Sequence, residues 1–498
     1  MKTVVAIIIA AFLFAGTSCK KFLAAYSQNK TFLQTADDLE EVLVGEGYQG
    51  GPIWVKYAFM DDDAEYHPGV PYGGEKSFPR FGIHFWQQDP DMDSQNMLDA
   101  SYANDYGALY KNIAALNTVL LNIPLLKEKN VAADRLLRIS GEAHFLRAYY
   151  YFLLADIYGK PYSVATAATD FGIPLKLSSE IEAAPFARAS VQQVFNQMET
   201  DLLEAEKELN GFNESSVIRA NQATAQTLLS RLYLYREDYE KAITYANKVI
   251  EKRYSLADMN TWTAGTPFIS LTSSEVIQAI PVSGTEFNMN DLMKDISINP
   301  ALNNNYRASE ELLNIYSNKD LRRLAFFITT DDGDFLARKS GEKGSSTLAD
   351  LSTIRLPELY LNKAEALAIL GRNEEAVAAV QELRKNRFKP EDLTVIDLNG
   401  APLVEFIRNE RRRELCFEFH RWFDLRRYGV NSKYPYGKVT RHLSYAWDLS
   451  GRYVEGYYEL KPYAEEPTAY VMPIPRREIE LGRGVISNAL RPKRALQH

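Results

Sequence analysis

Acidic side chains gather in two stretches of the sequence where their spacing could support chemistry. The first is 406–429, FIRNERRRELCFEFHRWFDLRRYG, in which Glu414 and Glu418 are four residues apart and would share one face of a helix. With His420 and Asp424 nearby, such a pair could act as general acid and base or bind a metal ion. The stretch has no H-E-x-x-H or comparable ligand spacing, and three consecutive arginines lie beside these acids. We therefore interpret it as a structural array of ion pairs.

The second acidic stretch is 61–63, a run of three aspartates in a region rich in glycine. It could bind a cation such as calcium, although its spacing is not that of an EF-hand loop. A glycosidase with a carboxylate pair is the enzyme class that these acids would suggest. No nucleophile, metal or phosphate-loop spacing accompanies them. We expect no catalytic residue and, apart from that calcium ion, no cofactor.

Aromatic side chains could act by binding rather than by catalysis. The chain contains 30 Tyr and 5 Trp, residues with a flat apolar face and a polar edge. Such rings can stack on the C–H face of a sugar while neighbouring polar groups bond its hydroxyls. The ligand-binding candidates are Trp86, Trp262, Tyr72 and Tyr66. For each of them, the alternative is that the ring only anchors a loop on the core.

Composition excludes some classes of protein. The chain has 498 residues, of which 46% are hydrophobic, as in ordinary globular proteins. Its net charge of −8 argues against nucleic acid as a partner, because phosphate binding requires a basic face. The two cysteines, Cys19 and Cys416, are too few for a disulfide framework. Cys416 lies among apolar residues and is expected to fill the core.

The first residues have the pattern of an export signal. Lys2 precedes an apolar run from Val4 to Phe14, which is too short to cross a bilayer core of ~30 Å. Small residues then lead to Cys19, so residues 1–18 are predicted to be a signal peptide. The pattern is similar to a bacterial lipoprotein signal, cleaved before Cys19 so that its thiol takes the lipid. The alternative is an ordinary signal peptide with an incidental cysteine.

The elements that must position these residues are mainly helices. Apolar residues recur at helical spacing over about 104–252 and 353–430, which predicts a helical frame. Three irregular, aromatic-rich inserts, about 46–103, 253–352 and 431–498, are expected to carry the binding function.

Two helix pairs within the frame have the tetratricopeptide pattern of large and small residues, at 219–252 and 356–387. They are not adjacent in sequence, so the frame is no simple tandem solenoid. The stretch 406–429 is predicted to be one long helix that stops at Gly429. Its charges are expected to pair three residues apart: Glu410 with Arg413, Glu418 with Arg421, and Asp424 with Arg427.

Several segments together resemble a known family. They are CKKFL from Cys19, AHFLRAYYYFLLADIYGKP, IRLPELYLNKAEALAILGR, ERRRELCFEFHRWFDLRRYG and the closing YVMPIPRREIEL. In this order they are similar to the SusD/RagB family of Bacteroidetes surface lipoproteins. The resemblance covers the whole mature chain, 19–498.

The resemblance implies a mostly α-helical, SusD-like single domain built on tetratricopeptide-type helix pairs with long irregular inserts. It also implies a non-catalytic protein, anchored by lipid to the cell outer membrane and facing outward. Such proteins capture oligosaccharides or glycans and deliver them to a SusC-like TonB-dependent transporter. A peptide-binding, RagB-like uptake subunit and a tetratricopeptide adaptor for another protein are the alternatives. The shared motifs maintain the fold, so the resemblance assigns no ligand residue.

Overall fold

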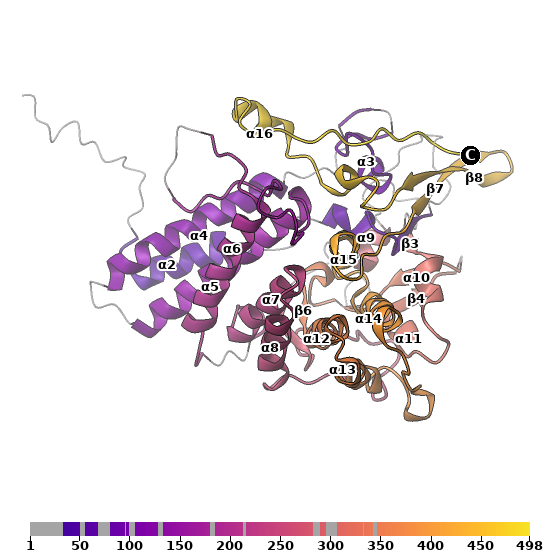
Figure 1. Ribbon diagram of the computed structural model, residues 1–498, viewed down its shortest axis with the longest axis horizontal. Coiled ribbons are helices and arrows are strands. Elements are labelled where there is room, and N and C mark those ends of the chain that lie inside the picture. The colour runs from indigo at the N-terminus through magenta and orange to yellow at the C-terminus, as the bar shows by residue number, and fades with distance from the viewer. Residues whose placement is uncertain are drawn as a thin grey trace, which may run out of the picture.

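The protein is mostly α-helical, and its longer helices form a frame (Figure 1). The computed structural model describes residues 33–49, 55–67, 80–94, 96–98, 105–127, 133–179, 185–212, 216–281, 289–294, 306–331, 333–341 and 346–498. The longer helices are α4 (Asp105–Lys127), α5 (Ala133–Tyr158), α6 (Val191–Glu208), α7 (Gln222–Tyr235), α8 (Tyr239–Ile250), α12 (Leu356–Leu370), α13 (Asn373–Lys385), α14 (Gly400–Leu415) and α15 (Arg421–Val430).

Helices of the frame pack on one another largely in chain order. Contacts join α4 to α5, α5 to α6, α6 to α7 and α7 to α8. The next helix in the stack is α12. It packs on α8, although the insert 253–352 separates the two helices in sequence. The two predicted tetratricopeptide pairs, α7–α8 and α12–α13, are therefore neighbours in space. The insert leaves the frame after α8 and returns to it at α12.

Local sequence signals explain where these helices begin and end. The side chains of Ser190 and Asn221 accept hydrogen bonds from the third residues of α6 and α7, and both form complete capping boxes. Pro357 lies in the first turn of α12, where its missing N–H costs nothing. The same helix ends at Gly371, whose φ of 84° is a conformation that glycine adopts without strain.

The remaining elements are short and lie in the inserts and the tail. They are α2 (Ala36–Val42), η1 (Leu43–Gly47), η2 (Val55–Phe59), β1 (Ala64–Tyr66), α3 (Phe81–His84), β2 (Val276–Gln278), α9 (Met289–Lys294), β3 (Tyr306–Ala308), α10 (Glu310–Asn314), α11 (Arg322–Phe326), β4 (Phe327–Thr329), β5 (Phe335–Ala337), η3 (Asp350–Ser352), β6 (Ile354–Arg355), η4 (Pro390–Asp392), β7 (Thr440–Asp448), β8 (Gly451–Leu460), η5 (Pro467–Tyr470) and α16 (Arg476–Leu481). The strands pair antiparallel as β1–β3, β2–β6, β4–β5 and β7–β8. In Figure 1, α2 and the β7–β8 hairpin lie at opposite ends of the molecule.

Buried apolar side chains form two clusters. The larger lies within the helical frame and includes Leu109, Ile113 and Leu116 of α4. By length and composition α4 could also cross a membrane, but these leucines and isoleucine place it in the core. The smaller cluster lies under the insert and includes Tyr306 and Cys416. Cys416 is buried as predicted.

The prediction of one long helix over 406–429 is wrong, because the chain breaks between α14 and α15. Phe417 and Phe419 adopt positive φ values of 60° and 65°, which interrupt the helix. Lys339 supports the break, since its Nζ donates to the carbonyl oxygens of Glu414 and Cys416 at 2.7 and 2.8 Å. A buried cation thus satisfies carbonyl groups that a continuing helix would have bonded internally.

The same break changes one of the predicted ion pairs. Glu410–Arg413 and Asp424–Arg427 form as expected, each at 2.7 Å. Glu418 instead contacts two cations that are distant in sequence, whereas Arg421 pairs with Asp62. Ion pairs in this protein therefore join separate elements as well as neighbouring helical turns.

Candidate binding site

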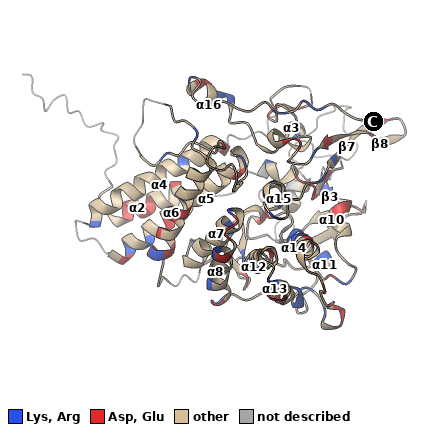
Figure 2. Ribbon diagram, viewed as in Figure 1, with Lys and Arg blue, Asp and Glu red and all other residues tan. Residues whose placement is uncertain are grey.

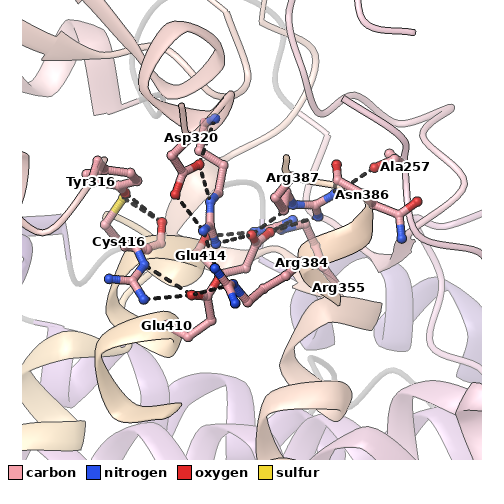
Figure 3. A network of polar contacts seen from close by, with 12 residues as sticks. Ala257, Tyr316, Asp320, Arg355, Arg384, Asn386, Arg387, Glu410, Glu414 and Cys416 are labelled. Atoms are coloured by element: carbon pink, nitrogen blue, oxygen red, sulfur yellow. Dashed lines mark hydrogen bonds and ion pairs between the residues drawn. The ribbon is translucent and has the colours of Figure 1, made fainter. Parts of the chain in front are cut away.

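A buried network of charged side chains lies at the end of α14, where the sequence places the potential acid–base pair (Figure 3). Glu414 is at its centre and accepts hydrogen bonds from Arg387 at 2.9 and 3.0 Å, from Arg355 at 3.1 Å and from Arg322 at 3.2 Å. All four side chains are fully buried. The arginines come from α11, the β6 strand and the turn that follows α13, so the network joins the insert 253–352 to the frame.

The protonation states in this network oppose acid–base catalysis. Burial alone would raise the pKa of Glu414, but the charges of Arg387 and Arg355 hold it well below its usual range. In the same way, burial is outweighed by nearby arginines that lower the pKa of Glu410 to about 2. Burial and neighbouring cations depress the pKa of His420 well below its usual value. These three groups keep one protonation state near neutral pH, so they fit a structural role rather than proton transfer.

The aspartate run 61–63 is buried and already neutralised by the protein. Its carboxylate oxygens lie within 4.8 Å of one another, close enough to hold a cation. Asp62 accepts hydrogen bonds from Arg421 and Lys438, and Asp63 accepts one from Arg412 at 2.7 Å. Burial, together with the two neighbouring carboxylates, raises the pKa of Asp61 well above its usual value. A calcium ion would have to displace three cations, so these residues do not fit the predicted metal site.

Two of the predicted ligand-binding aromatics are buried, so they offer no stacking face to a ligand. Trp86 is 0% exposed, its Nε1 donates to the Met60 carbonyl at 2.7 Å, and its ring stacks on His442. Tyr66 is 4% exposed and packs edge-on against Tyr306. The prediction for Trp86 and Tyr66 is corrected, because both rings anchor their segments on the core.

The other predicted site residues are Trp262, Tyr72 and Cys19. Trp262 is half-buried beside the smaller core, and its Nε1 donates to the Thr266 carbonyl at 3.2 Å. Its role in ligand binding stays a prediction. Tyr72 and the predicted lipid-bearing Cys19 lie outside the described residues.

An open cavity of about 440 Å³ lies between the start of α4, the segments around Pro174 and Phe186, and α16. We call it the α4–α16 cavity. Its walls combine flat rings with charged side chains. They include Tyr106, Tyr110, Phe186, Lys176, Glu478 and Arg483. A concave, mostly apolar surface with a few converging polar groups is the usual form of a small-ligand site.

The aromatic wall of the α4–α16 cavity is held in place by its own contacts. The rings of Tyr106 and Tyr110 are 4.8 Å apart, and the Tyr110 hydroxyl donates to the Pro174 carbonyl at 2.7 Å. The Lys176 ammonium lies 4.8 Å from the centre of the Phe186 ring. Burial raises the pKa of Tyr106 to about 12, so its phenol stays protonated. The arrangement can bind a ligand by ring stacking and hydrogen bonding.

Sequence reasoning missed this cavity for a physical reason. Tyr106 and Tyr110 share α4 with Leu109 and Ile113, so the sequence pattern predicts only a helix that faces the core. The other wall, α16, lies in a tail that has little periodicity. The available signal was the four-residue spacing of two tyrosines at the first turns of a helix, which places both rings on one face.

Charges of both signs are interspersed along the helices at both ends of the molecule (Figure 2).

Comparison with known proteins gives a consistent result. The model of the SusD family matches residues 334–490, and a SusD-like model described as starch-binding and associating with the outer membrane matches residues 75–234. Together they span more than half of the chain and include both walls of the α4–α16 cavity. SusD-like protein P2 of Formosa agariphila is 23% identical over 487 residues, which are 85% of this chain and 91% of that protein.

Solved structures share the fold. A SusD superfamily protein from Bacteroides fragilis has a TM-score of 0.68 at 21% identity, covering 91% of this chain and 99% of that one. A SusD-like carbohydrate binding protein from Bacteroides vulgatus has a TM-score of 0.66 at 20% identity, covering 90% and 97%. The fold class predicted from the sequence is confirmed, and this chain belongs to the SusD family.

Proposed function

We propose that this protein is a non-catalytic lipoprotein of the outer membrane that captures oligosaccharides and delivers them to a SusC-like TonB-dependent transporter. The observation that carries the proposal is the α4–α16 cavity, an open, ring-lined surface in a chain of the SusD family. Phenol and phenyl rings can cover the C–H faces of sugar units, while Lys176, Glu478 and Arg483 are placed to bond hydroxyls.

The relatives support a carbohydrate ligand. One matched family model is described as starch-binding, and one structural neighbour is described as carbohydrate binding. The buried state of the acids at the end of α14 supports binding without turnover, because their carboxylates are bonded to arginines. Attachment to the membrane through Cys19 follows from the signal-like start of the sequence.

Affinity electrophoresis in gels containing amylopectin, laminarin, xylan, pectin or mannan tests the ligand class. We expect at least one polysaccharide to retard the protein, with no reducing sugar released during prolonged incubation. Retardation by none of them, together with calorimetric binding of a peptide library, would favour the peptide-binding alternative. Release of sugar by the purified protein would contradict the non-catalytic assignment.

Separate measurements test the anchor and the transporter. Cells that express the full chain should incorporate labelled palmitate into it, and Cys19→Ala should abolish the label. The lipidated protein should copurify with a β-barrel transporter whose deletion stops uptake of the retarding polysaccharide. A protein that copurifies with such a partner but binds neither glycan nor peptide would instead be an adaptor.

A further inference from the structure

A second cavity lies between α14 and the segment 433–436, which follows α15. Its volume is about 260 Å³, and it shares no lining residue with the α4–α16 cavity. One stripe of α14, formed by residues at three- and four-residue steps from Ala401 to Asn409, makes one wall. We call it the α14 cavity.

Two buried arginines line the α14 cavity, and one of them has a donor without an acceptor. Arg408 is 7% exposed and donates to Glu365 at 3.0 Å and to the Tyr434 carbonyl at 2.8 Å, but its buried Nη2 has no hydrogen-bond partner among the described residues. Arg421 is 6% exposed and uses Nε and Nη2 to hold Asp62. A buried donor without an acceptor is costly, so an acceptor from a ligand would be favourable here.

Tyrosines of α15 and the segment 433–436 also line the α14 cavity. Tyr434 and Tyr436 are half-buried, and the ring of Tyr436 meets the buried Tyr428 edge-on at 6.4 Å. Asn409 on α14 adds an amide that can both donate and accept. This combination of rings, amide and guanidinium groups suits a sugar unit with a charged substituent.

The charges that line the α14 cavity favour an anion. Lys433 joins Arg408 and Arg421 as a third cation. The acidic side chain among the lining residues is Glu405, which is exposed and can turn into solvent. Guanidinium groups bind planar carboxylates through paired hydrogen bonds, which a neutral hydroxyl cannot match.

We propose that the α14 cavity is a second binding site, which takes an acidic sugar unit bearing a carboxylate or a sulfate ester. The anionic oxygens would accept hydrogen bonds from Arg408 and Arg421, and the sugar ring would lie against Tyr434 and Tyr436. The choice of a sugar rather than another acid rests on the proposed carbohydrate-binding function. The site itself does not depend on the α4–α16 cavity.

Titration of the full-length mature protein with four small probes tests this site. The probes are methyl β-D-glucuronide, methyl β-D-glucoside, methyl β-D-glucoside 6-sulfate and acetate, followed by NMR shifts or calorimetry. We expect the glucuronide or the sulfate to bind about tenfold more tightly than the neutral glucoside, and the preference to weaken in high salt. Equal affinity for acidic and neutral sugars, equal affinity for acetate, or no binding at the solubility limit would each overturn the proposal.

Variants locate the site. Tyr436→Ala should weaken binding of the acidic sugar about fivefold, because it removes a stacking face without touching either arginine. Tyr453→Ala, at an exposed tyrosine of β8, is the matched control and should leave that affinity unchanged. Thermal melting of both variants excludes loss of fold. Unchanged affinity in Tyr436→Ala would place the acidic sugar elsewhere and overturn the assignment.

A variant of the other cavity separates the two proposals. Phe186→Ala should reduce polysaccharide retardation but leave binding of the acidic probe intact. If acidic probes bind through Tyr436 while no polysaccharide depends on Phe186, the proposed capture role of the α4–α16 cavity fails alone.

Discussion

The charge network at the end of α14 and the α4–α16 cavity contain charged and aromatic side chains in opposite surroundings. In the network, Glu414 and its three arginines are fully buried and bonded to one another. In the cavity, Lys176, Tyr110 and Phe186 are half-buried and Arg483 is exposed. The charges of the network at the end of α14, which the sequence shows as a dense cluster, therefore stabilise the structure. The charges of the α4–α16 cavity are scattered in the sequence and are accessible to a ligand.

The comparison shows that residues of the same types are fully buried in the network and partly exposed at the cavity. Arginine and glutamate in a dry network cannot rearrange without leaving a charge unpaired. Aromatic rings follow the same rule, because Trp86 is enclosed by the core whereas Phe186 is half-buried at the cavity. The predictions below alter buried charged groups first and a cavity residue last.

Removal of the central carboxylate of the network should have the largest effect. Glu414→Ala would leave Arg322, Arg355 and Arg387 buried without their shared partner, and should lower the free energy of unfolding by about 3–5 kcal/mol. Urea denaturation followed by circular dichroism measures the change. The control is Glu375→Ala, which removes an exposed partner of Arg372 and should change stability little. Equal stability of the two variants would contradict the scaffold role.

Acidification should weaken the buried ion pairs of Glu410 and Glu365. Nearby arginines, acting against burial, lower the pKa values of Glu410 and Glu365 to about 2 from a usual value near 4.5. A depressed carboxyl pKa contributes stability above the unfolded pKa and loses it as pH falls through the folded pKa. The melting temperature should therefore fall steeply between about pH 4.5 and pH 2. A flat profile across that window would show that these ion pairs contribute little.

Asp156 is expected to respond to pH in the opposite direction. Burial, only partly offset by Arg426 and Arg231, raises its pKa to about 7 from a usual value of 3.8. Because this folded-state pKa is raised, the stability it contributes is present at low pH and is lost as pH rises through 7. Asp156→Asn should thus melt at a higher temperature than the wild type at pH 8 and at nearly the same temperature at pH 4. A larger difference at pH 4 than at pH 8 would reverse the sign and refute this explanation.

The smallest expected effect concerns the cavity. Phe186→Ala should reduce affinity for an oligosaccharide prepared from the retarding polysaccharide by about 1 kcal/mol, or roughly fivefold, through loss of ring stacking. Calorimetry measures this, and the melting temperature should change little because Phe186 is only half-buried. Val454→Ala, at an exposed position of the β7–β8 hairpin, serves as the control. Equal affinities of Phe186→Ala and Val454→Ala would argue against capture in this cavity.

The sequence predicted the frame much better than the site. Helical periodicity and caps such as Ser190 depend on neighbouring residues, so α6 and the two tetratricopeptide pairs could be derived from local patterns. The break after Leu415 could not, because it depends on Lys339, which the fold brings from the insert. The burial of Trp86 depends in the same way on His442 of the distant β7 strand.

Ligand-binding residues are harder to predict because they are defined by what surrounds them. Nothing in the sequence near Tyr110 shows that Phe186 and α16 complete a cavity around it. Acids at helical spacing, such as Glu414 and Glu418, look like a catalytic pair until the partners that neutralise them are known. The fold could be predicted from family resemblance. Only the structure distinguishes buried aromatic rings from accessible ones.

A crystal structure of the protein with an oligosaccharide from the retarding polysaccharide would test the central claim most directly. The account predicts a sugar ring against Tyr110 or Phe186 in the α4–α16 cavity, with the arginines around Glu414 unmoved. An oligosaccharide seated elsewhere, with that cavity empty, or one reaching the carboxylate of Glu414, would contradict it.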